Sequence, residues 1–264
     1  MNEIKVLHTM PELETVVDLQ VSVWGLNPRN AVPSALLHVL ALRGGLVLGA
    51  YDSQRMVGIL LALPAQDTHT RDWILWSHMT GIIPSYQGRG VGTALKRFQR
   101  KWALEQGYRR IGWTVDPLQR GNAHFNFHIL GDDAAMISNT YHVNFYGDMD
   151  DDINRGIPSD RIEAMWHLDQ PSLRSLTDSE GITLLSIDDK LQPCRANPDQ
   201  SWNKSTYYVA LPPDLNAIRS ISQEAVLAWR LALRETLQAA LAHGYSIVDF
   251  LPTANHNKYV LKRV

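Results

Sequence analysis

The feature that most constrains this chain is a glycine-rich hexapeptide, Gln87-Gly88-Arg89-Gly90-Val91-Gly92. It stands between an apolar run that stops at Pro84 and an amphipathic run that starts at Val91. Three glycines at alternate positions let the backbone turn tightly and bring successive N–H groups to one place, and a following helix adds its positive N-terminal end. The segment therefore predicts a strand, a loop and a helix that bind an anion such as a pyrophosphate.

Both flanks of the loop support this interpretation. Residues 73–83 are rich in β-branched and aromatic side chains, which favours a strand, and Pro84 ends that strand because it donates no ladder hydrogen bond. After the loop, Gly107 follows an amphipathic run as a C-terminal stop. The apolar stripe of that helix is Val91, Leu95, Phe98 and Trp102, and its polar face is Lys96, Arg97, Arg100 and Lys101.

Two common nucleotide-binding motifs are disfavoured by their missing parts. A Walker loop has Lys before its final Ser or Thr, whereas Val91-Gly92-Thr93 has none. A Rossmann fingerprint lies on the first βα turn and is followed about 20 residues later by an acidic residue that ends the next strand. The present loop lies too far along the chain, and residues 109–113 offer no acid.

The loop resembles the pyrophosphate loop of the GNAT family of acyl-CoA N-acyltransferases, in which Gln or Arg is followed by two residues, Gly, one residue, and Gly or Ala. Gln87, Gly90 and Gly92 match that pattern. The resemblance covers roughly residues 4–150 and implies an α/β fold of the α+β type, with a mixed, mostly antiparallel sheet and helices on both faces. It also implies acetyl-CoA or another acyl-CoA as co-substrate.

The predicted element order agrees with that family. Strand 4–7 and helix 10–24 come first, helix 32–42 follows, and strands 46–51 and 56–63 form a hairpin. We place a GNAT-like acyl-CoA-binding domain at residues 1–168 and a C-terminal αβ extension at residues 169–264.

The extension contains an echo of the first domain. A helix, Gly-Tyr and a strand occur around Gly107-Tyr108 and again around Gly244-Tyr245, but residues 214–223 contain no glycine loop. One interpretation is a degenerate second half without a phosphate site, and the other is ordinary αβ-loop chemistry. Both predict one cofactor site per chain.

A reaction of the implied kind needs a base for the attacking ammonium, a donor to the thioester oxygen and a proton for the leaving thiolate. His78 is our candidate base because it lies four residues before Ile82, on the same face of a regular strand. The alternative is a core or sheet-surface histidine. Backbone N–H groups near Ile82 and Ile83 are expected to bind the pantetheine amides.

The usual thiolate acid of the family is missing. The resemblance aligns Arg120, Ala123 and Phe127 with its Asn, Ala and Tyr positions, and Phe127 cannot protonate sulfur. Water is one replacement. The other is a tyrosine of the following strand region, for which we favour Tyr146 over Tyr141.

The remaining assignments concern binding. Asn122 is expected either to contact CoA or to cap a helix that begins there. Trp24 is a candidate lining residue of the acceptor pocket and Arg161 a candidate for binding one end of an amino-acid acceptor, with packing or surface ion pairing as alternatives. No metal is predicted. The residues that we expect to contact the cofactor are Ile82, Ile83, Gln87, Gly88, Arg89, Gly90, Val91, Gly92, Thr93 and Asn122.

Composition limits the partners. Twenty-five basic and 27 acidic residues give no broad attraction to nucleic acid. No run of ~18 apolar residues suggests a membrane span. The N-terminus lacks a long apolar leader and Cys194 is the single cysteine, so a cytoplasmic location is expected.

These features together predict an acyl-CoA-dependent N-acyltransferase acting on a small-molecule amine. One alternative is an N-succinyltransferase acting on an amino acid, with Arg89, Arg120 or Arg161 holding the distal carboxylate. Others are a non-catalytic CoA-binding sensor or assembly module, and a protein-modifying enzyme with its acidic groove at residues 148–152. Residues beyond about 150 are expected to set specificity or to form a homodimer contact.

Overall fold

The computed structural model describes residues 3–68, 70–147, 156–174, 181–196, 202–252 and 257–264. The chain forms two compact units, Met1–Trp113 and Thr114–Val264, and each is described by itself. None of the described helices combines the length and the apolar character that a membrane crossing needs.

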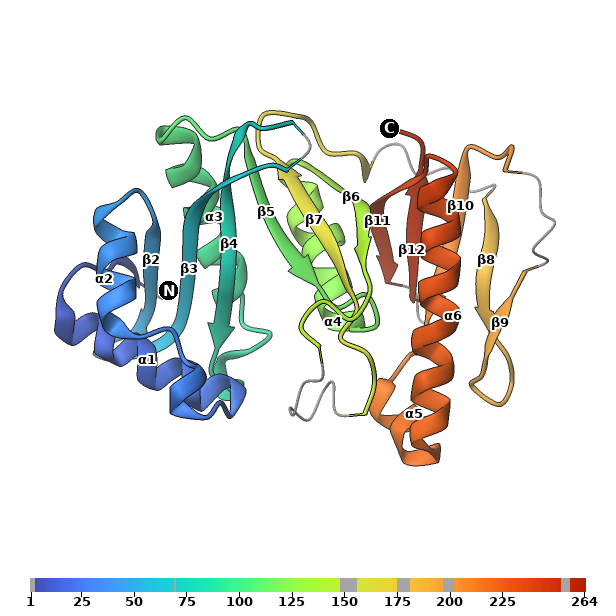
Figure 1. The fold of residues 1–264 in the computed structure, drawn as a ribbon, viewed down its shortest axis with the longest axis horizontal. Helices are drawn as coiled ribbons and strands as arrows, with labels where there is room; N and C mark the ends of the chain where they lie inside the picture. The colour runs from blue at the N-terminus through green and yellow to red at the C-terminus, as the bar shows by residue number, and fades with distance from the viewer. Residues whose placement is uncertain (1–2, 69, 148–155, 175–180, 197–201, 253–256) are drawn as a thin grey trace. The chain divides into compact units, whose positions relative to one another are not determined.

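In the described residues of the first unit, five strands form one sheet and three helices pack on it; these elements are labelled in Figure 1. The strand order is β1-β2-β3-β4-β5, antiparallel except for the parallel pair β4–β5. This confirms the predicted order of elements. Their bounds are β1 (Glu3–Val6), α1 (Met10–Trp24), α2 (Ser34–Leu42), β2 (Leu46–Asp52), β3 (Arg55–Gln66), β4 (Trp73–Ile82), α3 (Val91–Glu105) and β5 (Arg110–Val115), with short 3-10 turns at Pro28–Asn30 and Pro84–Tyr86.

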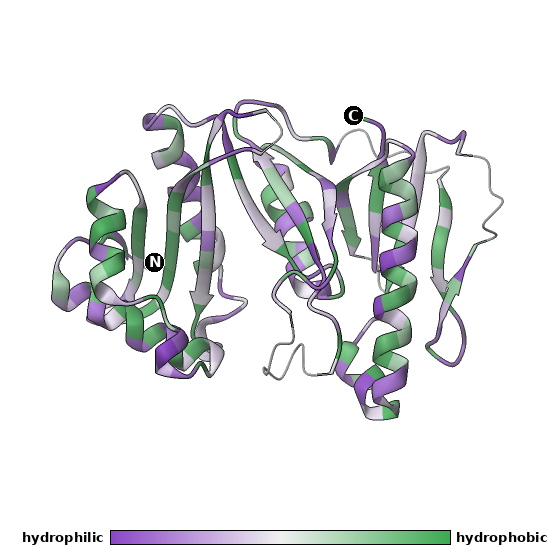
Figure 2. Ribbon diagram, in the orientation of Figure 1, coloured by the Kyte–Doolittle hydropathy of each residue, from purple (hydrophilic) through white to green (hydrophobic). Residues whose placement is uncertain are grey.

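Helices cover both faces of this sheet. Gly58 on β3 faces Val91 and Leu95 of α3, at 3.2 and 3.3 Å from where its Cβ would lie. Gly81 on β4 pairs with Ile59, the next residue along β3, and faces Trp24 of α1. Successive residues of a strand point to opposite faces, so α1 and α3 lie on opposite sides. The central strands β2 and β3 are hydrophobic along most of their length (Figure 2), as a sheet covered on both faces requires.

Strand β4 has two irregularities. It pairs with β5 at Leu75↔Ile111 and Trp76↔Gly112, and within the described residues the pairing ends there. We call the end of this pairing the fork. On its other edge, Leu61 and Ala62 of β3 pair with Met79 and Ser77, so His78 is an extra residue. An extra residue of this kind is a β-bulge, which locally redirects the strand and its side chains.

Among its described residues, the second unit is a seven-stranded sheet with strand order β7-β6-β11-β12-β10-β8-β9, and of these described pairs only β10–β8 is parallel. Helix α6 runs along one face (Figure 1). The elements are α4 (Arg120–Ala123), the π-helical turn η3 (His124–Ile129), the 3-10 turn η4 (Leu130–Asp132), β6 (Ala135–His142), β7 (Arg161–His167), β8 (Ile182–Ile187), β9 (Pro193–Arg195), β10 (Thr206–Leu211), α5 (Leu215–Ile221), α6 (Gln223–Ala242), β11 (Ser246–Pro252) and β12 (Asn257–Lys262).

The helix, Gly-Tyr and strand pattern has the same local backbone conformation in both parts of the chain. Gly107 and Gly244 both have a positive φ, and each following tyrosine N–H donates to a helix carbonyl five residues back. Their surroundings differ, because β4 pairs directly with β5 whereas β12 lies between β10 and β11. The degenerate repeat and the domain boundary at 168/169 stay predictions.

Candidate active site

The glycine loop is an exposed cradle of backbone donors. Gly88 and Gly90 have φ values of +72° and +81°, which favour glycine, and no atom lies within 4 Å of where a Cβ would be at either residue. The N–H groups of residues 88–93 donate to no group in the described part of the chain. Because Val91 is buried and anchors the start of α3, these donors surround the positive end of a 15-residue helix. The geometry fits a pyrophosphate.

Side chains hold this loop in place. Gln87 donates from Nε2 to the carbonyl oxygen of Ile82 at 3.0 Å, which ties the loop to the end of β4. The Tyr86 hydroxyl donates to Asp52, and the Arg89 guanidinium lies 5.3 Å from the centre of the Tyr86 ring. Arg89 is exposed, so its positive charge is available beside the cradle.

The bulge removes the reason for placing the His78 and Ile82 side chains on the same face of β4. Ile82 contacts the α3 side of the sheet, since its Cδ1 lies 2.7 Å from where a Cβ would be at Gly58. The extra residue breaks the alternation between His78 and Ile82, so the expectation of a shared face drawn from a regular strand does not apply. His78 is exposed, and partial burial against the protein still lowers its pKa. The side chain is thus accessible and favoured in the neutral form.

One backbone N–H group after the bulge is already hydrogen-bonded within the sheet. Ile83 is buried and its N–H donates to the carbonyl oxygen of Val57 at 3.1 Å. That N–H, which we expected to bind pantetheine, is therefore used within the sheet.

Trp24 lies against the same strand. Its Cη2 is 2.7 Å from where a Cβ would be at Gly81, so only glycine allows this approach. The indole remains about one-third exposed. The structure thus places Trp24 on the stretch of β4 that also carries His78.

A polar cluster missed by the sequence analysis lies under the fork. Lys96 is 3% exposed, its Nζ donates to Ser77 Oγ at 2.8 Å, and it lies 3.7 Å from the centre of the Trp113 ring. Ser77 in turn donates to Gln99 Oε1 at 3.3 Å. Burial lowers the pKa of Lys96 to about 7.

The prediction that Lys96 lies on the polar face of its helix was wrong. Phe98 and Trp102 are only half-buried, whereas Lys96, Gln99 and Ala103 are buried. These three recur at the spacing of a helix face, so the spacing was available as a signal. We did not recognise this spacing as a buried face because Lys96 and Gln99 are polar.

In the second unit, Tyr146 and Arg161 come together. The Tyr146 hydroxyl is hydrogen-bonded to Thr114 Oγ1 of β5 at 3.3 Å, and the Arg161 guanidinium lies 5.2 Å from the Tyr146 ring centre. Tyr146 is half-exposed, whereas Arg161 is buried and donates to the Asp160 carbonyl oxygen at 2.8 Å. Two residues selected independently from the sequence are therefore neighbours.

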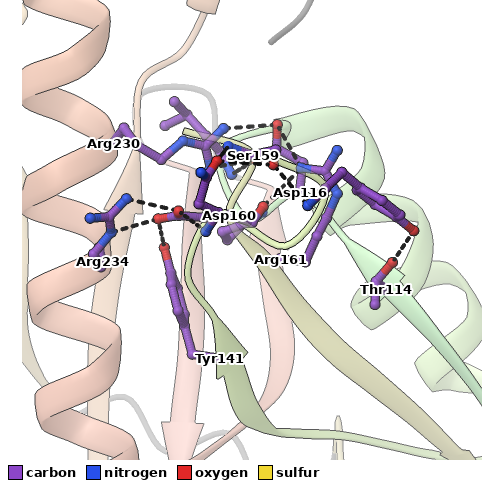
Figure 3. A network of polar contacts seen from close by, with 12 residues as sticks. Thr114, Asp116, Tyr141, Ser159, Asp160, Arg161, Arg230 and Arg234 are labelled. Atoms are coloured by element: carbon purple, nitrogen blue, oxygen red, sulfur yellow. Dashed lines mark hydrogen bonds and ion pairs between the residues drawn. The ribbon is translucent and has the colours of Figure 1, made fainter. Parts of the chain in front are cut away.

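Asp160 is the centre of a buried ionic network (Figure 3). Arg234 binds its carboxylate through two hydrogen bonds of 2.8 Å, and the Tyr141 hydroxyl donates to it at 2.7 Å. Burial and this hydrogen bond raise the pKa of Tyr141, whose hydroxyl is held by Asp160. Asp116 pairs with fully buried Arg230 at 2.7 and 3.0 Å. The sequence analysis singled out neither Arg230 nor Arg234.

Two further candidates lie near the start of this unit. Asn122 is exposed, but α4 begins at Arg120 with Gln119 as its N-cap, so the capping expectation was wrong. Its proposed contact with CoA stays a prediction. Phe127 is fully buried and packs edge-on against Tyr259 at 5.8 Å, in agreement with a structural role.

Within the described residues, no group of three or more His, Cys, Asp or Glu side chains is arranged to hold a metal ion. His124 and His128 stack at 5.2 Å, and His128 is hydrogen-bonded to Asp249 and Arg174. The acidic run at 148–152 lies outside the described residues.

The part of the chain that contains the glycine loop matches a known protein family. Residues 16–127 match the model of the acetyltransferase (GNAT) family. The fold is similar to that of the ribosomal-protein-S18-alanine N-acetyltransferase from Escherichia coli, with 15% identity, a TM-score of 0.50, and coverage of 66% of this chain and 98% of that one. It is also similar to yncA from Salmonella typhimurium, solved with acetyl-CoA, with 14% identity, a TM-score of 0.50, and coverage of 64% and 95%. A search of curated protein sequences finds no match.

Proposed function

We propose that this chain is an acyl-CoA-dependent N-acyltransferase, because residues 16–127 match the model of the acetyltransferase (GNAT) family. It transfers an acetyl or other short acyl group to the primary amine of a small molecule, by direct attack within a ternary complex. The observation that carries the proposal is the loop at residues 87–92, which is exposed at residues 87–90 and whose glycine conformations and unused N–H groups fit a pyrophosphate.

The proposed binding mode uses the backbone more than side chains. The N–H groups of residues 88–93 hold the pyrophosphate, with Thr93 in the first turn of α3 and Arg89 adding positive charge. Backbone groups at the end of β4, including those of Ile82, hold the pantetheine arm. Asn122 is a further proposed contact. When bound, acyl-CoA supplies the thioester that is the acyl donor.

The proposed chemistry assigns one proton transfer to each of two side chains. His78 accepts a proton from the acceptor ammonium and passes it to water. The freed amine then forms the C–N bond to the acyl carbon as the C–S bond breaks, and the new amide nitrogen releases its extra proton to water. The thiolate takes its proton from the Tyr146 hydroxyl or from water. The lowered pKa of His78 supports its role, because the ring is then neutral and able to accept a proton near neutral pH.

Acceptor binding is assigned to Trp24, which lies on β4 at Gly81. Arg161 is hydrogen-bonded to the Asp160 carbonyl oxygen, lies 4.0 Å from the Asp116 carboxylate and contacts the Tyr146 ring. We assign it to orienting Tyr146 and to holding an acceptor carboxylate. The acceptor class, the homodimer and the cytoplasmic location are parts of this proposal that rest on the sequence.

The test is thiol release from acetyl-CoA and succinyl-CoA in the presence of a panel of primary amines. We expect wild-type turnover with at least one amine and a loss of roughly 100-fold or more in His78→Gln. His8→Gln, which changes an exposed histidine of the same unit, is the control and is expected to retain full activity. Tight binding of CoA without transfer to any amine would support the non-catalytic CoA-binding alternative instead.

A further inference from the structure

Lys96 contacts both arms of the fork at equivalent places. The last paired residues of the two strands are Trp76 on β4 and Gly112 on β5. Lys96 donates to Ser77 and lies over the ring of Trp113, and these are the next residues along the two strands. A single side chain of α3 therefore bridges the two strands where their pairing ends.

The position is an unfavourable one for a lysine. Its side chain is almost completely buried, and in the described part of the chain its amine contacts Ser77 and the Trp113 ring but no carboxylate. Desolvation of an ammonium group without an anionic partner opposes folding, and an apolar side chain of similar length would pack at lower cost. Packing alone therefore does not account for Lys96. The contacts that its ammonium group does make are the ones to the fork.

The contact to Ser77 also reaches the bulge. Ser77 is the residue directly before His78, and its hydroxyl accepts from Lys96 while it donates to Gln99, four-fifths of a turn further along α3. Two side chains of one helix thus hold the side chain of the residue immediately before the extra residue. A bulge leaves its extra residue without a ladder partner, so its geometry depends on neighbours of this kind.

We infer that Lys96 is a positioning residue for the proposed acyl transfer, holding Ser77 and Trp113 so that the fork and the bulge at His78 keep one geometry. This inference rests on the proposed function for its catalytic consequence. Its structural part, that Lys96 holds the bulge, does not. Lys96 touches neither acceptor nor donor, and it acts through β4 and β5.

The test compares Lys96→Met, which keeps most of the length and removes the charge, with Lys101→Met, the same change at a site of α3 that is 79% exposed. In Lys96→Met we expect amide hydrogen exchange at residues 77–79 to accelerate about tenfold or more. We expect kcat to fall roughly 10- to 100-fold, because a misplacement of about 1 Å at a reacting group has such an effect. Binding of acetyl-CoA, measured by calorimetry, should change less than threefold. Lys101→Met should change none of the three.

Ser77→Ala tests the same contact from the other side. It should reproduce the exchange and kcat effects, and the double variant should be no worse than either single one, because both remove one interaction. Exchange at residues 77–79 that stays unchanged in Lys96→Met would overturn the inference. So would an equal loss of kcat in Lys101→Met, or accelerated exchange with unchanged kcat. If wild-type protein acylates no amine, the proposed function fails, and the exchange experiment still decides whether Lys96 holds the bulge.

Discussion

The buried charge of Lys96 makes a quantitative prediction about stability and pH. Burial lowers the pKa of Lys96 from an ordinary 10.5 to about 7. Below pH 7 the folded and unfolded chains both carry this proton, and the folded state bears the full desolvation cost. Between pH 7 and 10.5 the folded state releases the proton while the unfolded state keeps it. Stability attributable to this group therefore rises with pH across that window.

The magnitude follows from the proton difference. One proton bound only by the unfolded state raises the free energy of unfolding by about 1.4 kcal/mol per pH unit. From pH 7 to pH 9 the wild-type chain should gain about 2 to 3 kcal/mol relative to Lys96→Met, which has no proton to release. At pH 6 to 7 the methionine variant should be the more stable protein, and its advantage should shrink as the pH rises.

Urea unfolding at pH 6, 7, 8 and 9 measures this difference, with circular dichroism and tryptophan fluorescence followed together to check that the transitions coincide. Lys101→Met is the control, since that lysine is exposed on the same helix. Its difference from wild type should vary little with pH. A difference between Lys96→Met and wild type that stays constant from pH 6 to 9 would refute the reasoning, because it would mean that Lys96 keeps an ordinary pKa.

Three further predictions concern single contacts. The acid limb of the kcat/KM profile should have its midpoint below pH 6.5, because burial lowers the pKa of His78, and His78→Gln should remove that limb. Gly81→Ala should push Trp24 off β4, since the new Cβ would lie 2.7 Å from the ring; overpacking should lower the unfolding free energy by about 1–3 kcal/mol in urea and raise the acceptor KM. Arg230→Met should lower the unfolding free energy by about 3–5 kcal/mol, because buried Asp116 loses both hydrogen bonds from Arg230 and keeps the one from the Leu118 N–H; a loss below 1 kcal/mol would contradict this.

Local sequence patterns predicted the elements of the first unit well. Helix α1 spans Met10–Trp24 as expected. The loop at 87–92 and the stop at Gly107 were also correct, because glycine conformations and helix periodicity depend on neighbours in the chain. These features were enough to indicate an anion site.

The missed features depend on residues far apart in the sequence. The bulge at His78 is defined by its register with β3 and leaves no signature in β4 itself. Asp116 and Arg230 are separated by 114 positions, so no local pattern joins them. Lys96 was assigned to solvent because lysine usually lies there, whereas its contacts come from β4 and β5.

The central claim is that the glycine loop binds the pyrophosphate of acyl-CoA, and calorimetric titration with acetyl-CoA tests it most directly. Gly90→Glu places a carboxylate in the cradle, and Gly107→Glu is the matched control, with φ of +84° against +81° and equally open surroundings. We predict micromolar binding by wild type, little change in Gly107→Glu, and a loss of at least tenfold in Gly90→Glu. No binding by folded wild-type protein, or equal binding by Gly90→Glu, would contradict the account.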